Sequence, residues 1–322
     1  MKVTVAENAG FCRGVKNAVD SALALAEQYG EVFTIGELIH NEGVVEHLKK
    51  KGVRAISLDE ARELPEGSVA LIRAHGIPRE DEALLRAHGV KLFDATCPVV
   101  KRIHRIVEER SAAGDDVIIV GDRNHDEVLG AASYGKNVTV VSDKEEPVFS
   151  DRPTSVAFQT TVLADRLGEI ARSAENSQKN EGKTVGIFNT ICYTTISRQN
   201  EARELARTHD AVIVLGSRTS ANTRRLYEVA SDVNPNTFFV TCAEELPAKI
   251  KHSDSISIVA GASAPPWLIQ EVTNLMSETQ NIAAEEINVA KEEAKEEATL
   301  REENAAEDKS AGEKAFTMED VV

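Results

Sequence analysis

Three of the four cysteines in this 322-residue sequence recur in one local context, about 90 residues apart. Cys12, Cys97 and Cys192 each follow a strand-like run and precede a helical pattern, in the segments AGFCRGV, FDATCPVV and FNTICYTT. A cysteine at a helix N-terminus meets free backbone N–H groups and the positive end of the helix dipole, which favour the thiolate. All three positions therefore suit metal ligation.

The spacing of these cysteines restricts the kind of metal site. The sequence has no C-x-x-C pair, which argues against a structural zinc ribbon and a thioredoxin-like redox site. Three dispersed thiolates on a 4Fe-4S cluster would leave one iron free to act as a Lewis acid. Two alternatives stay open: three buried structural thiols, and a catalytic zinc ion with one open position. Cys242 lacks the shared context and is interpreted as an incidental buried thiol.

Polar residues at other strand ends are expected to converge on the same centre. Several His, Ser and Asn side chains held by rigid strand ends can bind a diphosphate through many hydrogen bonds. These candidates are His40, His75, His125, Thr160, Ser220, Asn222 and Ser263. Each of them taken alone is equally well a capping or core residue, so their joint recurrence carries the prediction.

Glu127 is the candidate proton donor. It lies two residues after His125, so both side chains could flank one turn, and a carboxyl group near an anionic ligand holds its proton more readily. The alternative for Glu127 is a solvated surface carboxylate. No role is assigned to the histidines in or beside helical patterns, which are His47, His88, His104, His209 and His252.

The elements that must position these residues alternate along the chain. Short β-branched runs such as SVALIRAH, DDVIIVGD and DAVIVLGS are separated by helical patterns. This alternation predicts an α/β fold with parallel sheets, in which ligands bind at the carboxyl ends of the strands. We expect three similar α/β modules around a central iron-sulfur cluster, at residues 1–97, 98–192 and 193–277. Pairing of residues 1–12 with the third module is the alternative for the first segment.

The last segment differs in composition. Residues 278–322 are rich in Ala, Glu and Lys and contribute much of the formal net charge of −16. Such a stretch buries too little apolar surface to form a packed core, so we expect an acidic helical or disordered tail. A tether to another domain or partner is the alternative, because the stretch closes on the more apolar AFTMEDVV.

Composition and charge argue against several classes of protein. An acidic chain lacks the basic surface that phosphate backbones demand, so residues 1–277 are not expected to bind nucleic acid. No run approaches the ~20 apolar residues of a membrane helix, and the N-terminus has no apolar signal core. We therefore expect a cytoplasmic protein without membrane association, whose cysteines remain thiols.

Nine short segments place the candidate residues in a recognisable order. From about residue 1 to residue 270 they are AGFCRGV, IGELIHN, RAHG, DATCP, HDEV, QTT, ICYTT, TSAN and AGASAP. Over this region the sequence strongly resembles the 4-hydroxy-3-methylbut-2-enyl diphosphate reductases, a family of the non-mevalonate isoprenoid pathway. Two positions depart from the family pattern: Asp126 stands in place of a common proline, and Ala221 stands where some members have a second serine.

The resemblance implies a cofactor and a role for each candidate residue. It implies one 4Fe-4S cluster held by Cys12, Cys97 and Cys192, with one open iron. Diphosphate binding is implied for His40, His75, His125, Ser220, Asn222 and Ser263, with Ala221 contributing only its backbone N–H. By the same resemblance, Thr160 lies near the substrate hydroxyl and Glu127 is the proton donor.

The implied activity is the reductive dehydroxylation of (E)-4-hydroxy-3-methylbut-2-enyl diphosphate to isopentenyl and dimethylallyl diphosphate. The electrons would come from a donor such as ferredoxin or flavodoxin. Two other classes of function stay open: an open-iron hydratase or dehydratase, which needs no external reductant, and a non-catalytic cluster sensor or electron carrier. The second of these leaves the many polar strand-end residues unexplained.

Overall fold

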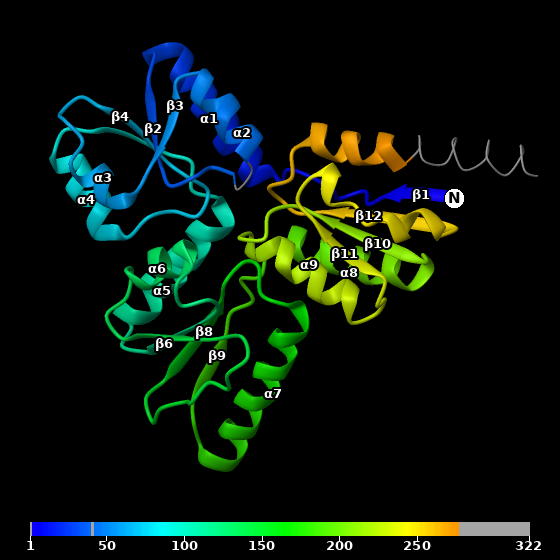
Figure 1. The fold of residues 1–322 in the computed structure, drawn as a ribbon. Coiled ribbons are helices and arrows are strands. Elements are labelled where there is room, and N and C mark those ends of the chain that lie inside the picture. Colours follow the sequence, from blue (N-terminus) through cyan, green and yellow to red (C-terminus); the bar gives the residue numbers. More distant parts are fainter. Residues whose placement is uncertain (1, 40–41, 277–322) are drawn as a thin grey trace, which may run out of the picture. The chain divides into compact units, whose positions relative to one another are not determined.

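The computed structural model describes residues 2–39 and 42–276 of the chain (Figure 1). Residues 1–273 form one compact unit, and a second unit comprises residues 274–322. The first unit contains three four-stranded sheets, and each strand pair in the described residues is parallel. The expected α/β fold with three parallel sheets is confirmed. The expected tail, residues 278–322, lies outside the described residues.

The first sheet has the strand order β3-β2-β4-β5. Its strands are β2 (Val32–Ile35), β3 (Val53–Ile56), β4 (Val69–Ile72) and β5 (Lys91–Asp94). The helices are α1 (Arg13–Tyr29), α2 (Glu42–Lys50), α3 (Leu58–Arg62) and α4 (Arg79–Ala87). Alternate residues of a strand point to opposite faces, so Leu71 joins a core with Ala22 of α1, whereas Ile72 joins a core with Leu85 of α4. Burial on both faces explains why β4 is apolar at every position.

The second sheet has the strand order β7-β6-β8-β9. Its strands are β6 (Asp116–Val120), β7 (Val138–Val141), β8 (Thr154–Phe158) and β9 (Val185–Ile187). The helices are α5 (Pro98–Ala112), α6 (Asp126–Ala132) and α7 (Ala164–Glu181). Again both faces are covered, because Val156 shares a core with Ile170 of α7 and the next residue, Ala157, shares another with Val107 of α5.

The third sheet has the strand order β1-β12-β10-β11. Its strands are β1 (Lys2–Val5), β10 (Ala211–Leu215), β11 (Thr237–Val240) and β12 (Ser255–Ala260). Helices α8 (Tyr193–Thr208) and α9 (Ala221–Ser231) precede the short 3-10 helices η1 (Ala243–Glu245) and η2 (Ala248–His252). Lys2 of β1 lies opposite Ser255 of β12, so the first strand of the chain belongs to the last sheet. Residues 266–276 are helical.

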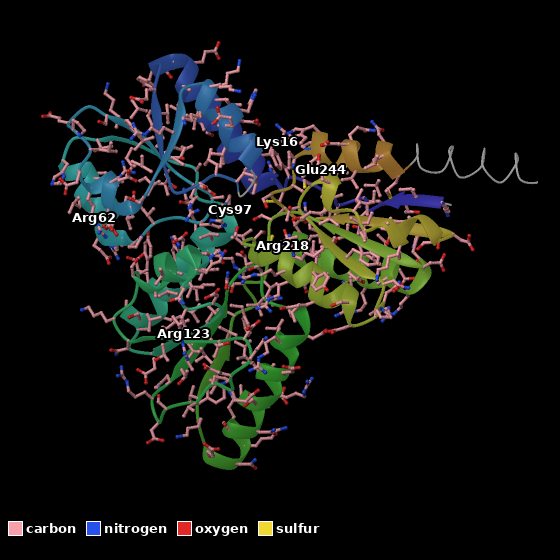
Figure 2. All side chains as sticks on the ribbon, viewed as in Figure 1. Lys16, Arg62, Cys97, Arg123, Arg218 and Glu244 are labelled. Atoms are coloured by element: carbon pink, nitrogen blue, oxygen red, sulfur yellow. The ribbon has the colours of Figure 1, made fainter. Side chains whose placement is uncertain are left out.

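The side chains labelled in Figure 2 lie on all three modules of the first unit. Figure 2 shows Arg62 of α3 near the edge of the ribbon, whereas Cys97 lies near its middle, between the modules. Within residues 2–39 and 42–276, no helix is long and apolar enough to span a membrane. The fold therefore offers one place where residues from all three sheets can meet.

Candidate functional site

Strands of all three sheets end around one cavity. The candidate residues that line it are Cys12, Cys97, Cys192, His75, His125, Glu127, Thr160, Ser220, Ala221, Asn222 and Ser263. The structure thus brings together every candidate site residue that it describes. His40, the remaining candidate, lies outside the described residues.

The three cavity cysteines occupy equivalent places in the fold. Cys12, Cys97 and Cys192 are the N-cap residues of α1, α5 and α8. Each donates its backbone N–H to a carbonyl oxygen of a loop that follows a neighbouring strand. These bonds run from Cys12 to Ala262 (3.2 Å), from Cys97 to Ala74 (3.0 Å) and from Cys192 to Thr160 (3.0 Å). The same backbone contact therefore holds each cysteine beside a loop that carries another candidate residue.

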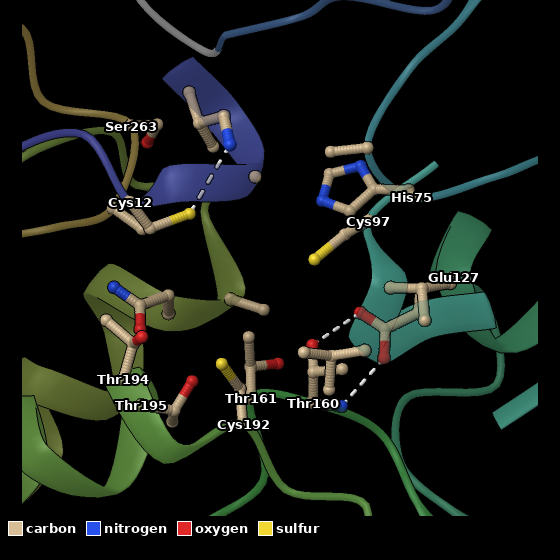
Figure 3. A pocket seen from close by; sticks show the side chains of 18 of the residues that line it. Cys12, His75, Cys97, Glu127, Thr160, Thr161, Cys192, Thr194, Thr195 and Ser263 are labelled. Carbon is tan, nitrogen blue, oxygen red and sulfur yellow. Dashed lines mark hydrogen bonds between the residues drawn. The ribbon is translucent and has the colours of Figure 1, made fainter. Parts of the chain in front are cut away.

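The sulfur atoms of Cys12, Cys97 and Cys192 point into the same space (Figure 3). Gly14, in the first turn of α1, lies against two of them: a β-carbon at this position would lie 3.1 Å from Cys97 Sγ and 3.9 Å from Cys12 Sγ. All three thiols are partly exposed. The sulfur atoms line a cavity instead of a packed core, which argues against the alternative of three buried structural thiols.

Two opposing effects act on the pKa of the Cys97 thiol at the start of its helix. Burial raises the pKa of the Cys97 thiol above its usual value. The backbone N–H groups of Val99 and Val100 lower this pKa without a hydrogen bond that caps the helix, and the thiols of Cys12 and Cys192 raise it again. The backbone N–H groups at this helix start thus favour the thiolate, as expected, but burial opposes them with a larger effect on the pKa.

Glu127 is buried near the start of α6, with 2% of its surface exposed. Thr160 contacts both carboxylate oxygens: its backbone N–H donates to Oε1 at 2.7 Å, and its hydroxyl donates to Oε2 at 2.7 Å (Figure 3). Burial raises the pKa of Glu127, while these two hydrogen bonds lower it by less. The alternative of a solvated surface carboxylate is therefore wrong, and the group is suited to hold a proton.

Two histidines from different sheets meet at the cavity. His75 follows β4 of the first sheet and His125 follows β6 of the second, and their ring centroids lie 5.1 Å apart in an edge-to-face arrangement. His125 is also the N-cap residue of α6, where its Nδ1 accepts a hydrogen bond from the backbone N–H of Glu127 at 3.2 Å. One backbone turn thus positions both the imidazole and the carboxyl group.

The third sheet contributes neutral hydrogen-bonding groups. Ser220 is the N-cap residue of α9, and its hydroxyl accepts a hydrogen bond from the N–H of Thr223 at 3.4 Å. Ala221 follows as the first helical residue, at a helix end whose first N–H groups have no partner inside the helix. The buried Asn222 Nδ2 and Ser263 Oγ have no hydrogen-bond partner among the described residues. These groups remain available for a bound anion.

Other residues that line the cavity were not among the candidate site residues. They are Gly14, Thr161, Thr194, Thr195 and Arg198, among others. Arg198 lies on α8, six residues after Cys192, and the buried Ala202 lies about one turn further along the same helix. A charged residue on the buried face of a helix was the signal that would have revealed it, because arginine is seldom buried without a reason.

The departure at Asp126 creates a contact between two sheets. Its carboxylate pairs with Arg73, a buried residue that follows β4. Arg73 also donates to the carbonyl oxygen of Glu37 at 3.1 Å. The aspartate therefore ties the loop after the first sheet to the start of α6, next to Glu127.

Cys242 lies apart from these residues. It precedes η1 and does not line the cavity. Its thiol is partly exposed, so the expected burial was wrong, since the short 3-10 helix leaves the side chain near solvent. Its position outside the cavity separates it from the other three cysteines.

Comparison with known proteins places the chain among the reductases that it resembles. It matches the LytB protein family over residues 3–277. The 4-hydroxy-3-methylbut-2-enyl diphosphate reductase of Aquifex aeolicus is 40% identical, over 86% of this chain and 96% of that protein. The protein of the same name from Geobacter metallireducens is 38% identical, over 86% and 98%. For the namesake from Clostridium acetobutylicum, 37% identical, the match covers 87% of this chain but only 44% of that protein.

Solved structures agree with this result. The structure of (E)-4-hydroxy-3-methyl-but-2-enyl diphosphate reductase, described as the terminal enzyme of the non-mevalonate pathway, is 38% identical with a TM-score of 0.60. The match covers 86% of this chain and all of that one. A reductase structure from Plasmodium falciparum, 24% identical over 85% of this chain and 87% of that one, shares the fold with a TM-score of 0.77. With three parallel sheets, nine ordered motifs and these relatives, the chain belongs to the LytB protein family.

Proposed function

We propose that the chain is an oxidoreductase that converts (E)-4-hydroxy-3-methylbut-2-enyl diphosphate to isopentenyl and dimethylallyl diphosphate by reductive dehydroxylation. The names of its relatives support this reaction. The observation that carries the proposal is the meeting of Cys12, Cys97 and Cys192 in one cavity with the buried carboxyl group of Glu127. A reductive loss of a hydroxyl group needs a source of electrons and a source of protons at the same place.

The cysteines fit one 4Fe-4S cluster with an open iron. Three partly exposed thiols from three helix starts face one space, and the missing side chain of Gly14 keeps that space open beside Cys97. Thiolates supplied one at a time by three separate helix starts suit a cluster that keeps one iron open. When bound, the cluster supplies electrons and a Lewis-acidic iron.

The diphosphate is bound by groups that were left without partners. Asn222 Nδ2, Ser263 Oγ and the first N–H groups of α9, including that of Ala221, donate hydrogen bonds to its oxygens. Ser220 adds a contact beside them, and His75 and His125 add contacts from other walls of the cavity. The resemblance adds His40, which lies outside the described residues. Many neutral donors fixed by strand ends hold the anion in one orientation, which places the allylic hydroxyl for C–O cleavage.

Glu127 supplies the proton with which the hydroxyl leaves as water. Its raised pKa keeps the carboxyl group protonated at a higher pH than usual. When Glu127 is protonated at Oε2, the 2.7 Å contact lets this O–H donate to Thr160 Oγ1. The threonine hydroxyl then donates to the substrate hydroxyl, so the pair moves one proton toward the leaving oxygen, which departs as water. Two electrons, delivered one at a time, and a second proton at either end of the remaining allyl group complete the two products.

The electrons come from a one-electron carrier such as ferredoxin or flavodoxin, and the enzyme works in the cytoplasm. The resemblance of residues 1–270 to the reductase family supports both statements. No nucleic-acid or membrane partner is proposed for residues 1–277, whose formal net charge of −7 (−16 for the chain less −9 for residues 278–322) gives no basic surface for a phosphate backbone.

An anaerobic assay with and without a one-electron donor tests the proposed function. Complete dependence of isopentenyl and dimethylallyl diphosphate formation on the donor is the expected result. A hydratase or dehydratase would consume the allylic diphosphate without any reductant. A cluster sensor would bind iron and sulfide but would not convert the allylic diphosphate. Either outcome, with intact protein, would overturn the reductase assignment.

A further inference from the structure

Arg198 on α8 is a buried cation in the wall of the cavity. Only 4% of the surface of Arg198 is exposed, and the residue lines the cavity. Two neutral carbonyl oxygens accept from its guanidinium group, Gly10 O at 2.6 Å from Nη2 and Ala260 O at 3.4 Å from Nη1. Nε has no hydrogen-bond partner among the described residues. The guanidinium is thus only partly satisfied by the protein.

The charge of Arg198 also lacks a carboxylate partner. The ion pairs found among the described residues do not include Arg198, although a buried cation is costly unless an anion compensates it. Burial lowers the pKa of Arg198. The negative charges that oppose this lowering are those of Cys12 and Cys192, followed by that of Glu201. Thiolates of the two cysteines would therefore provide the missing negative charge. In the other described positions of the cavity wall, the only carboxyl group is that of Glu127.

We propose that Arg198 is a positioning residue whose permanent positive charge and unused Nε donor act on the ligand thiolates of Cys12 and Cys192, and that it raises the reduction potential of the metal centre. This inference rests on the proposed function, because it needs a cluster held by these cysteines. A nearby cation stabilises the reduced form, which carries one more negative charge after the carrier has given up one electron. Hydrogen bonds to cluster sulfur act in the same direction.

The test compares Arg198→Gln and Arg198→Met with the unmodified protein, each purified anaerobically and analysed for iron and sulfide. The readout is the midpoint potential, from a redox titration followed by electron paramagnetic resonance of the reduced cluster. Removing the charge is expected to lower the equilibrium constant for one-electron reduction at least tenfold, which is a shift of about 59 mV to more negative potential. Equal potentials in the variants and the unmodified protein would overturn the inference.

Two controls separate charge from structure. Arg203→Gln changes another arginine of α8, whose partner is Asp165 at 2.9 Å, and should leave the potential unchanged. Arg198→Lys keeps the charge and should keep more of the potential than either neutral variant. A fall of the same size in Arg203→Gln would point to a general effect of α8 and would contradict a specific role of Arg198.

A measurement on the unmodified protein covers the case in which the variants do not fold. In holoenzyme with isotopically labelled arginine, pulsed electron paramagnetic resonance should detect coupling between the reduced cluster and an arginine nitrogen. Absence of this coupling would overturn the inference. An unmodified protein without iron and sulfide would instead contradict the proposed function, whereas an intact, active cluster with unchanged potentials would contradict only the role of Arg198.

Discussion

Two kinds of helix start in this molecule differ in what their first residue does. α3 begins after Ser57, whose hydroxyl accepts from the N–H of Glu60 at 3.1 Å while the N–H of Ser57 donates to the Glu60 carboxylate at 2.7 Å. At α5 and α8 the N-cap residues are Cys97 and Cys192, and neither side chain makes a capping hydrogen bond. The side chain of Ser57 therefore stabilises the start of its helix, whereas those of Cys97 and Cys192 do not.

Cysteine at these positions makes the helix starts less stable than serine would. An oxygen-bearing N-cap contributes about 1 kcal/mol relative to alanine, and serine would offer this at any of the three central positions. Cysteine is a weak hydrogen-bonding group but a strong metal ligand as thiolate. Three such weak caps at three helix starts that meet in one cavity are consistent with the proposed role of these cysteines as metal ligands.

The largest effect is expected from Glu127→Gln, compared with Glu60→Gln. Both glutamates lie in the first turn of a helix, but Glu127 is buried against Thr160, whereas Glu60 serves the helix cap. Loss of the proton donor should reduce turnover by about 10² to 10⁴-fold with cluster and substrate binding retained. Glu60→Gln should leave turnover unchanged in the same anaerobic assay.

The pH dependence of turnover sharpens this pair. Because burial raises the pKa of Glu127, activity that depends on its proton should persist above the usual carboxyl range and fall as the pH rises through the raised pKa. Glu127→Gln should lack this fall. Near-normal turnover in Glu127→Gln, or an unaltered pH profile, would remove Glu127 as the proton donor.

The next effect comes from Gly14→Ala, compared with Gly168→Ala on α7. The new β-carbon at position 14 would lie 3.1 Å from Cys97 Sγ and 3.3 Å from Cys97 Cβ, whereas the one at position 168 meets only Arg172 Nη1 at 3.5 Å. We expect Gly14→Ala to lower the bound iron several-fold. Gly168→Ala should keep its iron and gain about 1 kcal/mol of stability from helix propensity. Full iron content in Gly14→Ala would show that the space beside Cys97 is not needed.

A smaller effect is expected from His104, on the helix that begins after Cys97. Its ring is buried and stacks on Tyr134 with centroids 4.3 Å apart, and burial lowers its pKa to about 4 from 6.5. Below pH 6.5 the His104 side chain is protonated in the unfolded chain but still neutral in the folded protein. The free energy of unfolding should therefore fall by up to about 3 kcal/mol as the pH drops toward 4. His104→Phe should flatten this part of the curve in urea unfolding followed across that range. An equally steep fall in the variant would assign the pH dependence to other groups.

The smallest effect is expected from Ser57→Ala. Loss of the capping box should lower the free energy of unfolding by about 1 kcal/mol, because the N–H of Glu60 loses its acceptor. Turnover and iron content should stay the same, since α3 does not line the cavity. A loss of activity at unchanged stability would mean that the two kinds of helix start are not independent.

The sequence was sufficient to predict the residues whose chemistry recurs. Cys12, Cys97 and Cys192 share one local pattern, and strand ends of parallel sheets meet ligands, so their convergence followed from periodicity and spacing. The fold class was predicted for the same reason. The substrate was accessible only through the resemblance, because hydrogen-bond donors such as Asn222 and Ser263 suit many anions.

Environment was harder to predict than position. The burial of Glu127 depends on Thr160, a residue 33 positions away, and the raised pKa of Cys97 depends on packing between sheets. Arg198 and His104 were given no role, although a polar residue at helical spacing from buried neighbours was the available signal for each. Local patterns therefore indicated which residues act, and the assembled fold determined how they are tuned.

Iron and sulfide analysis of anaerobically purified protein tests the central claim most directly. The unmodified chain is expected to bind about four iron atoms and four sulfides, Cys12→Ser, Cys97→Ser and Cys192→Ser should each lose most of both, and Cys242→Ser should lose neither. If Cys97→Ser instead kept the full iron and sulfide content and the spectrum of the unmodified protein, the three cysteines would not form the metal centre.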